Sequence, residues 1–448
     1  MAAPRVRVLE WELFLRPVRT RLPFRYGSAV VTGAPVAHLR LRVEVDGGAV
    51  GGVSGAILPP LWFDKSPGRT HERDIQDLLR SARTAAEVYR EAGAADPWTL
   101  HRTAAPRVRE ELSDLNDLTA GFGAALVDLA VADAVCRATG RTFHRALRED
   151  LLGFGPLPLP ERPRRRIFVR HTVGLADPLD GTEGAPRAHD GLPETLEEVV
   201  RAYGVRYFKV KISADREATL DRLRRVAAVL DRTAGPYRVT LDGNEQFHTP
   251  EEVGRLMDAL EADPALRRFW RRTLWVEQPL ERGAALERPL GDLARRKRFL
   301  IDESDGTDDA AERARALGYA GVSVKSAKGL YRALLNFRRM RTAGGILSSE
   351  DLMNLPVVPL HQDLALAAAL GIAHSERNGH HYVRTWEVLS AREGRAAREE
   401  YPALYTDGPA GGPRLRIERG ALDLSDVNAY GFGVRSEPDA AALDPGRG

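Results

Sequence analysis

Several short apolar runs in the second half of the chain end in ionisable residues. Three of these runs end in an acid, and the acids are Asp242, Glu277 and Asp302. A fourth run, RYFKVKI, carries Lys209 and Lys211. A buried parallel strand is a near-continuous apolar run, so a carboxylate is tolerated only at its exit, where a cation or water can meet it. Because barrel enzymes act at that end of their strands, the pattern indicates a metal-dependent enzyme that removes a proton from carbon.

The three acids offer oxygen ligands from three successive strands. Such a hard, anionic set suits Mg²⁺, which usually keeps some water or substrate oxygens in its octahedron. Asn244, two residues after Asp242, is expected to face the same pocket and to hydrogen-bond a ligand or water. Taken singly, each carboxylate also fits a surface or helix-cap position. Zinc is disfavoured because no cysteine lies nearby and no histidine pair has HExxH spacing.

The lysines are candidates for proton transfer. Strand side chains alternate between faces, so Lys209 and Lys211 point the same way. If they face a barrel interior, like charge and desolvation lower their pKa toward a value useful for a base at neutral pH. Lys325 ends a later run, GVSVK, and in a closed barrel it approaches a substrate from the face opposite Lys211. The structural alternative is that these lysines only pair with neighbouring carboxylates.

The composition limits the other possibilities. The chain has 448 residues, of which 43% are hydrophobic, enough for two domains and a large core. Its 66 basic and 63 acidic residues nearly cancel, which predicts no nucleic-acid partner and no membrane-surface partner. Cys136 is the only cysteine, so no internal disulfide forms and a reducing, cytoplasmic location is expected. We expect no signal peptide and no apolar run long enough to span a membrane.

Residues 1–152 indicate an α+β domain. Strand-like patterns over residues 5–45 bracket the segment FRYGSAVVTG, a candidate mobile loop that carries Tyr26. Helical periodicity follows over residues 73–92 and 120–138, and Gly140 suits a helix C-cap. Residues 153–166 are rich in Pro, Gly and Arg, and we interpret them as a linker.

Strands and helices alternate across residues 167–400. The eight strand candidates are IFVRHTVG, RYFKVKI, VTLDGN, LWVEQP, FLIDE, GVSVK, GILSS and IAHSE. Crossovers long enough for helices favour an α/β fold with a closed, TIM-like (β/α)8 barrel. An open doubly wound sheet is the alternative, although no GxGxxG turn supports it. Residues 401–448 are expected to return to the first domain through RLRIERGALDL and to end in a disordered tail.

The motifs KVK, LDGN, VEQP, IDES and VxVKxxKG, in this order, resemble the enolase superfamily, in particular its mandelate racemase and muconate lactonizing branch. The resemblance covers nearly the whole chain. It includes an alanine-rich capping-domain helix with Asp133 and a closing segment, GALDLSDVNAYGFGV, that lacks the usual proline pair. The paired lysines, in place of a His-Asp base, resemble the muconate lactonizing type.

The resemblance implies a role for each motif residue. Mg²⁺, with Mn²⁺ as the alternative ion, would be bound by Asp242, Glu277 and Asp302. Lys211 and Lys325 would act as acid and base on the two faces of the substrate. Lys209 would polarise the substrate carboxylate and, with the metal, stabilise the charge of an enediolate.

The segments after the last two strands depart from known patterns. SSEDLMN and AHSERNGHHY lack the Asp-x-Asp pair that would suggest dipeptide epimerisation. We expect Glu350, His374 and Glu376 to contact a polar substrate together with Asn244 and with Tyr26 of the capping loop. The pair His380–His381 is either part of this pocket or a solvated loop.

The preferred function is racemisation or epimerisation of a small-molecule carboxylate, because lysines flank both faces. Syn-elimination by a dehydratase and cycloisomerisation would use the same site. A Schiff-base lysine, as in aldolases, would leave the three acids without a purpose. A non-catalytic, enolase-like binding protein is the remaining alternative. Homo-oligomers are expected by analogy with the superfamily alone.

Overall fold

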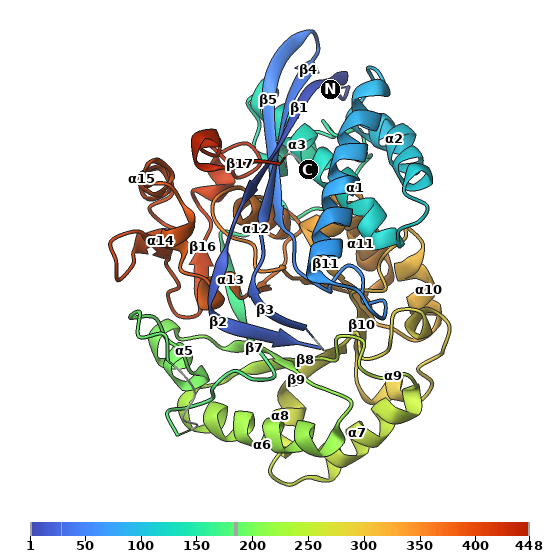
Figure 1. Cartoon of the computed structure of the whole chain (residues 1–448). Helices are drawn as coiled ribbons and strands as arrows, with labels where there is room; N and C mark the ends of the chain where they lie inside the picture. Colours follow the sequence, from blue (N-terminus) through green and yellow to red (C-terminus); the bar gives the residue numbers. More distant parts are fainter. Residues whose placement is uncertain (1, 28, 183–186, 447–448) are drawn as a thin grey trace.

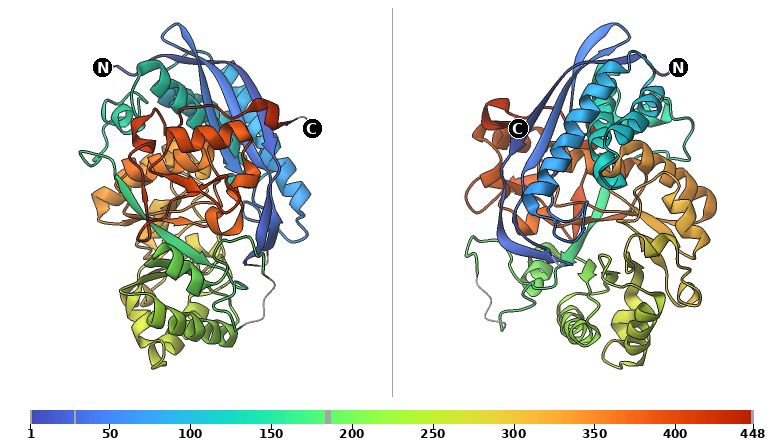
Figure 2. Two further views of the ribbon diagram at one scale, coloured as in Figure 1. Left: turned by 90° about the vertical axis from the view of Figure 1, so that its left-hand side faces the viewer. Right: turned by 45° about the vertical axis from the view of Figure 1, so that its right-hand side comes forward.

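The computed structural model describes residues 2–27, 29–182 and 187–446. It consists of a closed barrel and an α+β capping domain that packs against it (Figure 1). The capping domain, drawn in blue and cyan, sits above the barrel in that view, and the C-terminal segment lies beside both. Figure 2 shows the same arrangement from two further sides. The α+β domain and the barrel predicted from the sequence are both confirmed.

The capping domain is built on an antiparallel sheet with the strand order β17-β1-β4-β5. Buried and more accessible residues alternate along β1 and along the second half of β4, because one face of the sheet packs on helices. Strands β2 and β3 form a separate hairpin that extends toward the barrel (Figure 1). The elements are β1 (Val6–Arg16), β2 (Arg19–Tyr26), β3 (Ala29–Gly33), β4 (Val36–Val45), β5 (Gly48–Ile57), α1 (His71–Glu91), α2 (Pro97–Glu111), α3 (Asp117–Thr139) and α4 (Phe143–Arg148).

Helix α3 is the core of the capping domain. It packs against α1, α2, β4 and β5, and Gly140 ends it in the left-handed conformation, as predicted. The most apolar 18-residue window of this helix has a mean hydropathy of 1.6, so by length and composition the helix could span a membrane, contrary to the expectation that no run is long enough. However, 94% of its apolar window is buried inside the protein, so we assign it as a core helix.

The barrel consists of eight parallel strands, which are the eight predicted runs. Each strand pairs with the next, and β13 closes the ring on β6 through pairs such as Ser375 with Val169. This closure excludes the open sheet. The strands are β6 (Arg166–Val173), β7 (Tyr207–Lys211), β8 (Arg238–Asp242), β9 (Thr273–Glu277), β10 (Phe299–Ile301), β11 (Gly321–Val324), β12 (Ile346–Ser349) and β13 (His374–Arg377).

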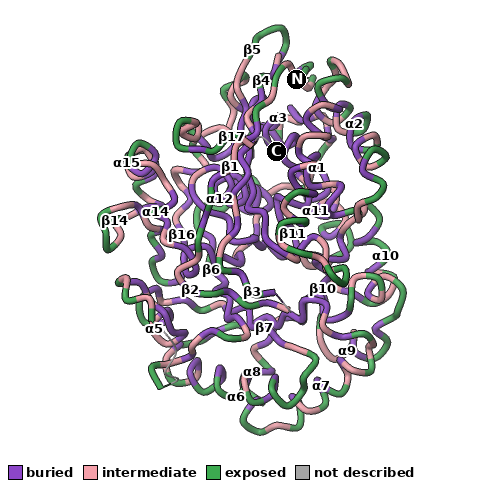
Figure 3. Tube along the Cα trace, viewed as in Figure 1, coloured by how far each residue is buried: buried purple, intermediate pink, exposed green. Residues whose placement is uncertain are grey.

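Helices cover the outside of the barrel. Figure 3 shows buried strands at the centre and exposed residues on the outer sides of helices such as α6 and α7. The helices of residues 196–400 are α5 (Leu196–Tyr203), α6 (Arg216–Thr233), α7 (Pro250–Ala262), α8 (Arg267–Arg272), α9 (Leu293–Arg296), α10 (Ala310–Ala316), α11 (Leu330–Ala343), α12 (Val358–Ala369), α13 (Gly379–Tyr382), α14 (Thr385–Val388) and α15 (Ala391–Glu400), with 3-10 turns η1 (Ala284–Leu286) and η2 (Ser326–Lys328). Of these, α14 and α15 pack against β14 (Tyr405–Asp407) and β15 (Pro413–Leu415) of the C-terminal segment.

The C-terminal segment differs from expectation. In the stretch RLRIERGALDL, β15 (Pro413–Leu415) pairs with β14 (Tyr405–Asp407), and β16 (Ala421–Asp423) extends the barrel sheet antiparallel to β6. Among the described residues of this segment, only β17 (Asp444–Pro445) returns to the capping sheet, where it pairs with β1. The prediction of a disordered tail is wrong for these residues, because backbone pairing with an edge strand needs no apolar side chains. The remaining 3-10 turns are η3 (Val427–Ala429) and η4 (Ala440–Ala442).

The crossing of α1 and α3 provides a test of the capping core. The Gly123 amide donates to the Ser81 hydroxyl at 2.9 Å, and a Cβ at Gly123 would overlap the Ser81 carbonyl. We expect Gly123→Ala to destabilise the protein by about 1–3 kcal/mol, because helix backbones must separate. Gly121→Ala, two residues away, is the control: its Cβ would meet only Arg109 Nη2 at 3.9 Å. It should be neutral or stabilise by up to about 1 kcal/mol. Urea unfolding midpoints measure both, and equal effects would contradict this packing.

Candidate active site

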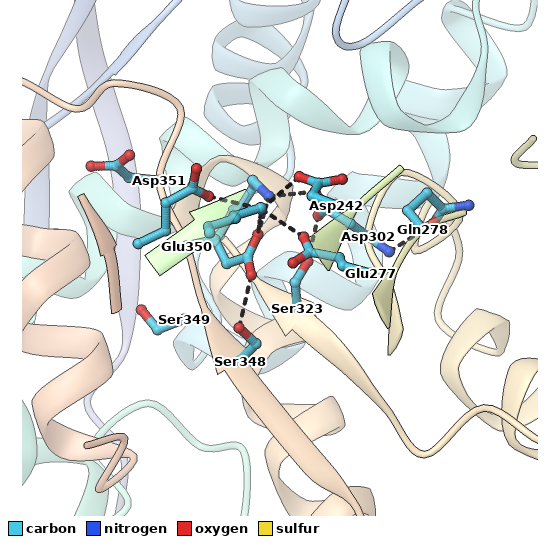
Figure 4. Close-up of polar contacts among 12 residues, drawn as sticks. Asp242, Glu277, Gln278, Asp302, Ser323, Ser348, Ser349, Glu350 and Asp351 are labelled. Carbon is cyan, nitrogen blue, oxygen red and sulfur yellow. Dashed lines mark hydrogen bonds and ion pairs between the residues drawn. The ribbon is translucent and has the colours of Figure 1, made fainter. Parts of the chain in front are cut away.

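The strand exits place the predicted ionisable side chains at one mouth of the barrel. Lys211 ends β7, Asp242 ends β8 and Glu277 ends β9, while Asp302 follows β10 and Lys325 follows β11. All five residues are at most 6% exposed. The close-up in Figure 4 shows that the acidic groups point toward one another from different strands.

Lys209 lies at the centre of this group. Its Nζ is 2.9 Å from Asp242, 2.8 Å from Glu277, 2.5 Å from Glu350 and 2.9 Å from Glu376. Burial alone would lower the pKa of Lys209, but the four negative charges outweigh it and raise the pKa well above its usual value. The expectation of a lowered pKa is therefore wrong for this lysine, because carboxylates rather than ammonium groups surround it.

Lys211 and Lys325 approach the pocket from opposite sides of the ring. Three strands, β8, β9 and β10, separate their strands β7 and β11. Lys211 Nζ is 2.6 Å from Asp242 Oδ2, and Lys325 Nζ is 2.5 Å from Asp302 Oδ2 and 3.2 Å from Glu350 Oε2. Burial would lower the pKa of Lys325, but Asp302 and then Glu350 raise it. Both lysines thus make ion pairs while they line the same cavity.

Three carboxylates are close enough to share one cation. Each of Glu277, Asp302 and Glu350 offers an oxygen, and these oxygens lie within 4.8 Å of one another. Glu277 Oε2 is buried and has no hydrogen-bond partner within the described residues. Burial, and then the charge of Glu350, raise the pKa of Glu277 well above its usual value. A buried acid with a free oxygen beside two further acids fits a divalent cation that prefers oxygen ligands.

Glu350 takes the place in this group that the sequence assigned to Asp242. Asp242 lies beside this group of three. It accepts a hydrogen bond from Lys211 Nζ, and another from the backbone N–H of Asn244 at 2.9 Å. Glu350 follows β12 directly and was expected to contact substrate. The run GILSSE could have indicated its role, because it also ends in an acid.

Arg170 on β6 was missed by the sequence analysis, although a charge in the middle of an apolar run was a usable signal. It is fully buried, and its Nη2 donates to Glu350 Oε1 at 2.6 Å. The Ser348 hydroxyl donates to the same oxygen at 2.8 Å. Together they hold Glu350 so that its other oxygen, Oε2, faces Lys209 and Lys325.

His374 does not line the pocket. It starts strand β13, so it lies at the far end of the strand from the mouth, where its Nδ1 is 2.8 Å from Arg170 Nη1. Its ring stacks against Tyr207 and Trp275 at centroid distances of 4.4 and 5.6 Å. Burial and then the positive charge of Arg170 lower the pKa of His374 to about 3. This position does not fit the predicted substrate contact.

The other predicted substrate residues have mixed positions. Asn244, Glu376 and Tyr26 line a cavity of about 30 Å³. Asn244 Oδ1 has no partner within the described residues, so it is available to a ligand. The Tyr26 hydroxyl instead donates to the Pro60 carbonyl at 2.6 Å, so it fixes the capping segment. Neither alternative given for His380–His381 fits the structure, because both side chains are buried and neither lines this cavity.

The capping domain covers the mouth of the barrel. Phe24, Val31 and Trp62 line the cavity from that side. Arg21 fastens the hairpin β2–β3 to the barrel, with Nε 2.6 Å from Asp190 and Nη1 donating to the His381 carbonyl at 2.8 Å. The turn of the hairpin includes residue 28, which lies outside the described residues. Where such a cover excludes water, the electrostatic interactions inside become stronger.

Comparison with known proteins identifies the fold. No protein-family model matches the sequence, and no curated protein matches it. Solved structures match nearly over their full length. The chain has the enolase-superfamily fold.

A dipeptide epimerase from Enterococcus faecalis V583, crystallised with Mg and L-Leu-L-Tyr, matches with a TM-score of 0.63 and 15% identity, over 95% of this chain and 99% of that one. A 2-chloromuconate cycloisomerase from Rhodococcus opacus 1CP matches with a TM-score of 0.63 and 18% identity, over 97% of this chain and 98% of that one. An enolase superfamily member from Listeria innocua Clip11262 matches with a TM-score of 0.63 and 15% identity, over 98% of this chain and 96% of that one. At these identities the likeness establishes this fold, and the chemistry must be argued from the site.

The cluster formed by the carboxylates of Glu277, Asp302 and Glu350 provides a test that does not depend on activity. We expect millimolar Mg²⁺ to raise the melting temperature by about 3 °C, because a cation that binds only the folded state relieves the repulsion of buried acids. Glu277→Gln should abolish this shift. Glu287→Gln, which changes an exposed acid of the barrel, is the control and should keep it. Differential scanning calorimetry with and without EDTA measures the effect, and an equal shift in both variants would refute this site.

Proposed function

We propose that the chain is an enolase-superfamily enzyme that uses Mg²⁺ to remove the α-proton of a small carboxylate, and that it acts as a racemase or epimerase. One observation carries this proposal: Lys211 and Lys325 line one cavity from opposite sides of the barrel, next to the clustered carboxylates of Glu277, Asp302 and Glu350. A lysine on each face is what inversion of a carbon centre requires, since one must take a proton and the other must return one.

Glu277 and Asp302 would hold the metal, with Glu350 or Asp242 completing the protein ligands. When bound, Mg²⁺, or Mn²⁺ in its place, would supply positive charge next to the substrate carboxylate. Lys209 can attract that carboxylate by its charge, because its ammonium stays charged among four acids. Both effects stabilise the enediolate that forms when the α-proton leaves.

Lys211 is the better candidate for the base. It contacts a single carboxylate, Asp242, whereas Lys325 contacts both Asp302 and Glu350. Lys325 would therefore start as the proton donor on the opposite face. The cover formed by Phe24, Val31 and Trp62 keeps bulk water away, so the proton returns from a lysine rather than from solvent.

Cycloisomerisation or syn-elimination is the second candidate. The two carboxylate contacts of Lys325 favour it, because a lysine held as a permanent cation would assist only one face of the substrate. One of the solved structures with this fold is a 2-chloromuconate cycloisomerase, which is compatible with this second candidate. Both candidates share the first step, which is abstraction of the α-proton.

Hydrogen exchange in D₂O separates the candidates. With Mg²⁺ and a panel of chiral carboxylates followed by NMR, we expect loss of the α-proton signal for at least one substrate. Lys211→Ala should abolish exchange of one stereoisomer and Lys325→Ala that of the other, each by about 10²-fold or more. Lys297→Ala is the control, since Lys297 binds the carbonyl oxygens of Trp270 and Thr273 and does not line the cavity.

The outcomes are distinct. Equal loss of both stereoisomers in both variants, with a product of changed connectivity or an eliminated group, would favour the second candidate over racemisation. Absence of exchange for every carboxylate, while Mg²⁺ still binds, would contradict both.

A further inference from the structure

A second cavity lies between the capping domain and the barrel, away from the substrate pocket. Its volume is about 490 Å³, a size that fits a small organic ligand. Helices α2 and α3 of the capping domain form one wall, and helix α11 of the barrel forms the other. Helix α3 contacts both α2 and α11, so the cavity lies where the two parts of the protein meet (Figures 1 and 2).

The lining of this cavity is strongly basic. It contains six cationic side chains, which are Arg102, Arg109, Lys328, Arg332, Arg338 and Arg339, against two acids, Asp128 and Asp308. Asp128 is already engaged, since His101 Nδ1 lies 2.8 Å and the Tyr89 hydroxyl 2.9 Å from its two oxygens. Asp308 is exposed, and its Oδ1 lies 3.8 Å from Nε of the buried Arg332, beyond hydrogen-bond distance.

Three of the arginines lack an anionic partner. Within the described residues, the side chains of Arg102, Arg109 and Arg338 form no hydrogen bond or ion pair, and Arg109 Nε is buried without a partner. Arg338 only lies over the ring of Phe154, at 4.6 Å. Arg102 is exposed and Arg109 and Arg338 are half-buried, so the distinctive feature is the gathering of three guanidinium groups without a carboxylate partner beside one cavity. Such a group favours an anion as its ligand.

Arg109 and Arg332 give further evidence for an anion in this cavity. Arg332 is 7% exposed, its Nη1 donates to the Asp305 carbonyl at 2.7 Å, and its Nε is buried without a hydrogen bond. Burial lowers the pKa of Arg332 and the positive charge of Arg109 lowers it further, whereas the charges of Asp305, Asp308 and Asp117 act in the opposite direction. Two guanidinium groups therefore face the same space with no carboxylate hydrogen-bonded to either in the described chain. An anion between them would remove that repulsion.

Apolar and helical features complete the cavity. Trp98, Phe154 and Leu335 line it beside the arginines, so a ligand with an apolar part finds a surface to pack against. Gly329, with φ of 122°, begins helix α11 at the cavity, and no side chain caps that helix. The free amides of a first helical turn favour negative charge.

We propose that this cavity binds a phosphate-bearing small molecule. The arginines bind the phosphate oxygens, for which their fork of donors is suited, and Trp98 and Phe154 contact whatever the phosphate is attached to. Such a ligand would join α2 and α3 to α11. The proposal does not depend on the reaction at the barrel mouth.

Isothermal titration with three probes tests the site: inorganic phosphate, pyrophosphate and adenosine monophosphate, each at matched ionic strength in EDTA. We expect saturable binding of one molecule per chain. Arg109→Gln combined with Arg338→Gln should weaken binding by about tenfold or more, the loss expected when charge-assisted hydrogen bonds are removed. Arg255→Gln, an exposed arginine of helix α7, is the matched control and should bind like the parent.

Further variants distinguish this cavity from the substrate pocket and an organic phosphate from the free ion. Lys211→Ala should not change phosphate binding, because Lys211 lines the substrate pocket and does not line the arginine-rich cavity. The melting temperature of the double variant without phosphate should equal or exceed that of the parent, because like charges are removed. Tighter binding of adenosine monophosphate than of inorganic phosphate, lost in Trp98→Ala, identifies an organic phosphate. Equal binding of the two identifies the free ion.

Three results would overturn the proposal. The first is that none of the probes gives saturable binding. The second is that the double variant binds as tightly as the Arg255→Gln control. The third is that Lys211→Ala abolishes the signal, which would place the anion in the substrate pocket.

Discussion

The ammonium of Lys209, buried among four carboxylates, is the interaction on which the barrel mouth depends. Its partners come from β8, β9, β13 and the exit of β12, so one side chain of β7 connects five of the eight strands. Carboxylates so close together in a low-dielectric interior would repel one another or take up protons. The cation keeps most of them ionised, and removal of one partner from such a buried network costs about 3–5 kcal/mol.

Arg170 repeats this arrangement one layer deeper. It binds Glu350 and the Ser348 hydroxyl, and it stacks over Trp275 at 5.3 Å, in a region that many barrels fill with aliphatic layers. Arg170 and Lys209 each bind one oxygen of the Glu350 carboxylate, and these two contacts determine its orientation. A metal ion at the mouth would meet Glu350 in an orientation already fixed, which reduces the reorganisation needed on binding.

The barrel could be predicted from the sequence, but the side-chain contacts inside the barrel could not. All eight strands were predicted, because parallel strands covered on both faces have a strong apolar signal. Glu350 and His374 were both expected to contact substrate, but Glu350 follows its strand and lies at the barrel mouth, whereas His374 begins its strand and lies at the other end. The tail was misread because β17 is held by backbone pairing, which leaves no side-chain pattern. Which of four acids share a cation depends on side-chain directions that spacing does not determine.

Lysine usage was a signal that the sequence analysis did not exploit. Only six of the 66 basic residues are lysine, and arginine serves everywhere else. Besides the three candidate catalytic lysines, Lys65 binds Glu303 at 3.0 Å and Lys328 lies 3.3 Å from Asp302, so only Lys297 is remote from the barrel mouth. A guanidinium stays protonated in proteins, whereas an ammonium is compact and can give up its proton. Lysine therefore suits positions where a small cation must fit between acids or where a proton must move. The rarity of lysine in this chain marks the barrel mouth before any fold is known.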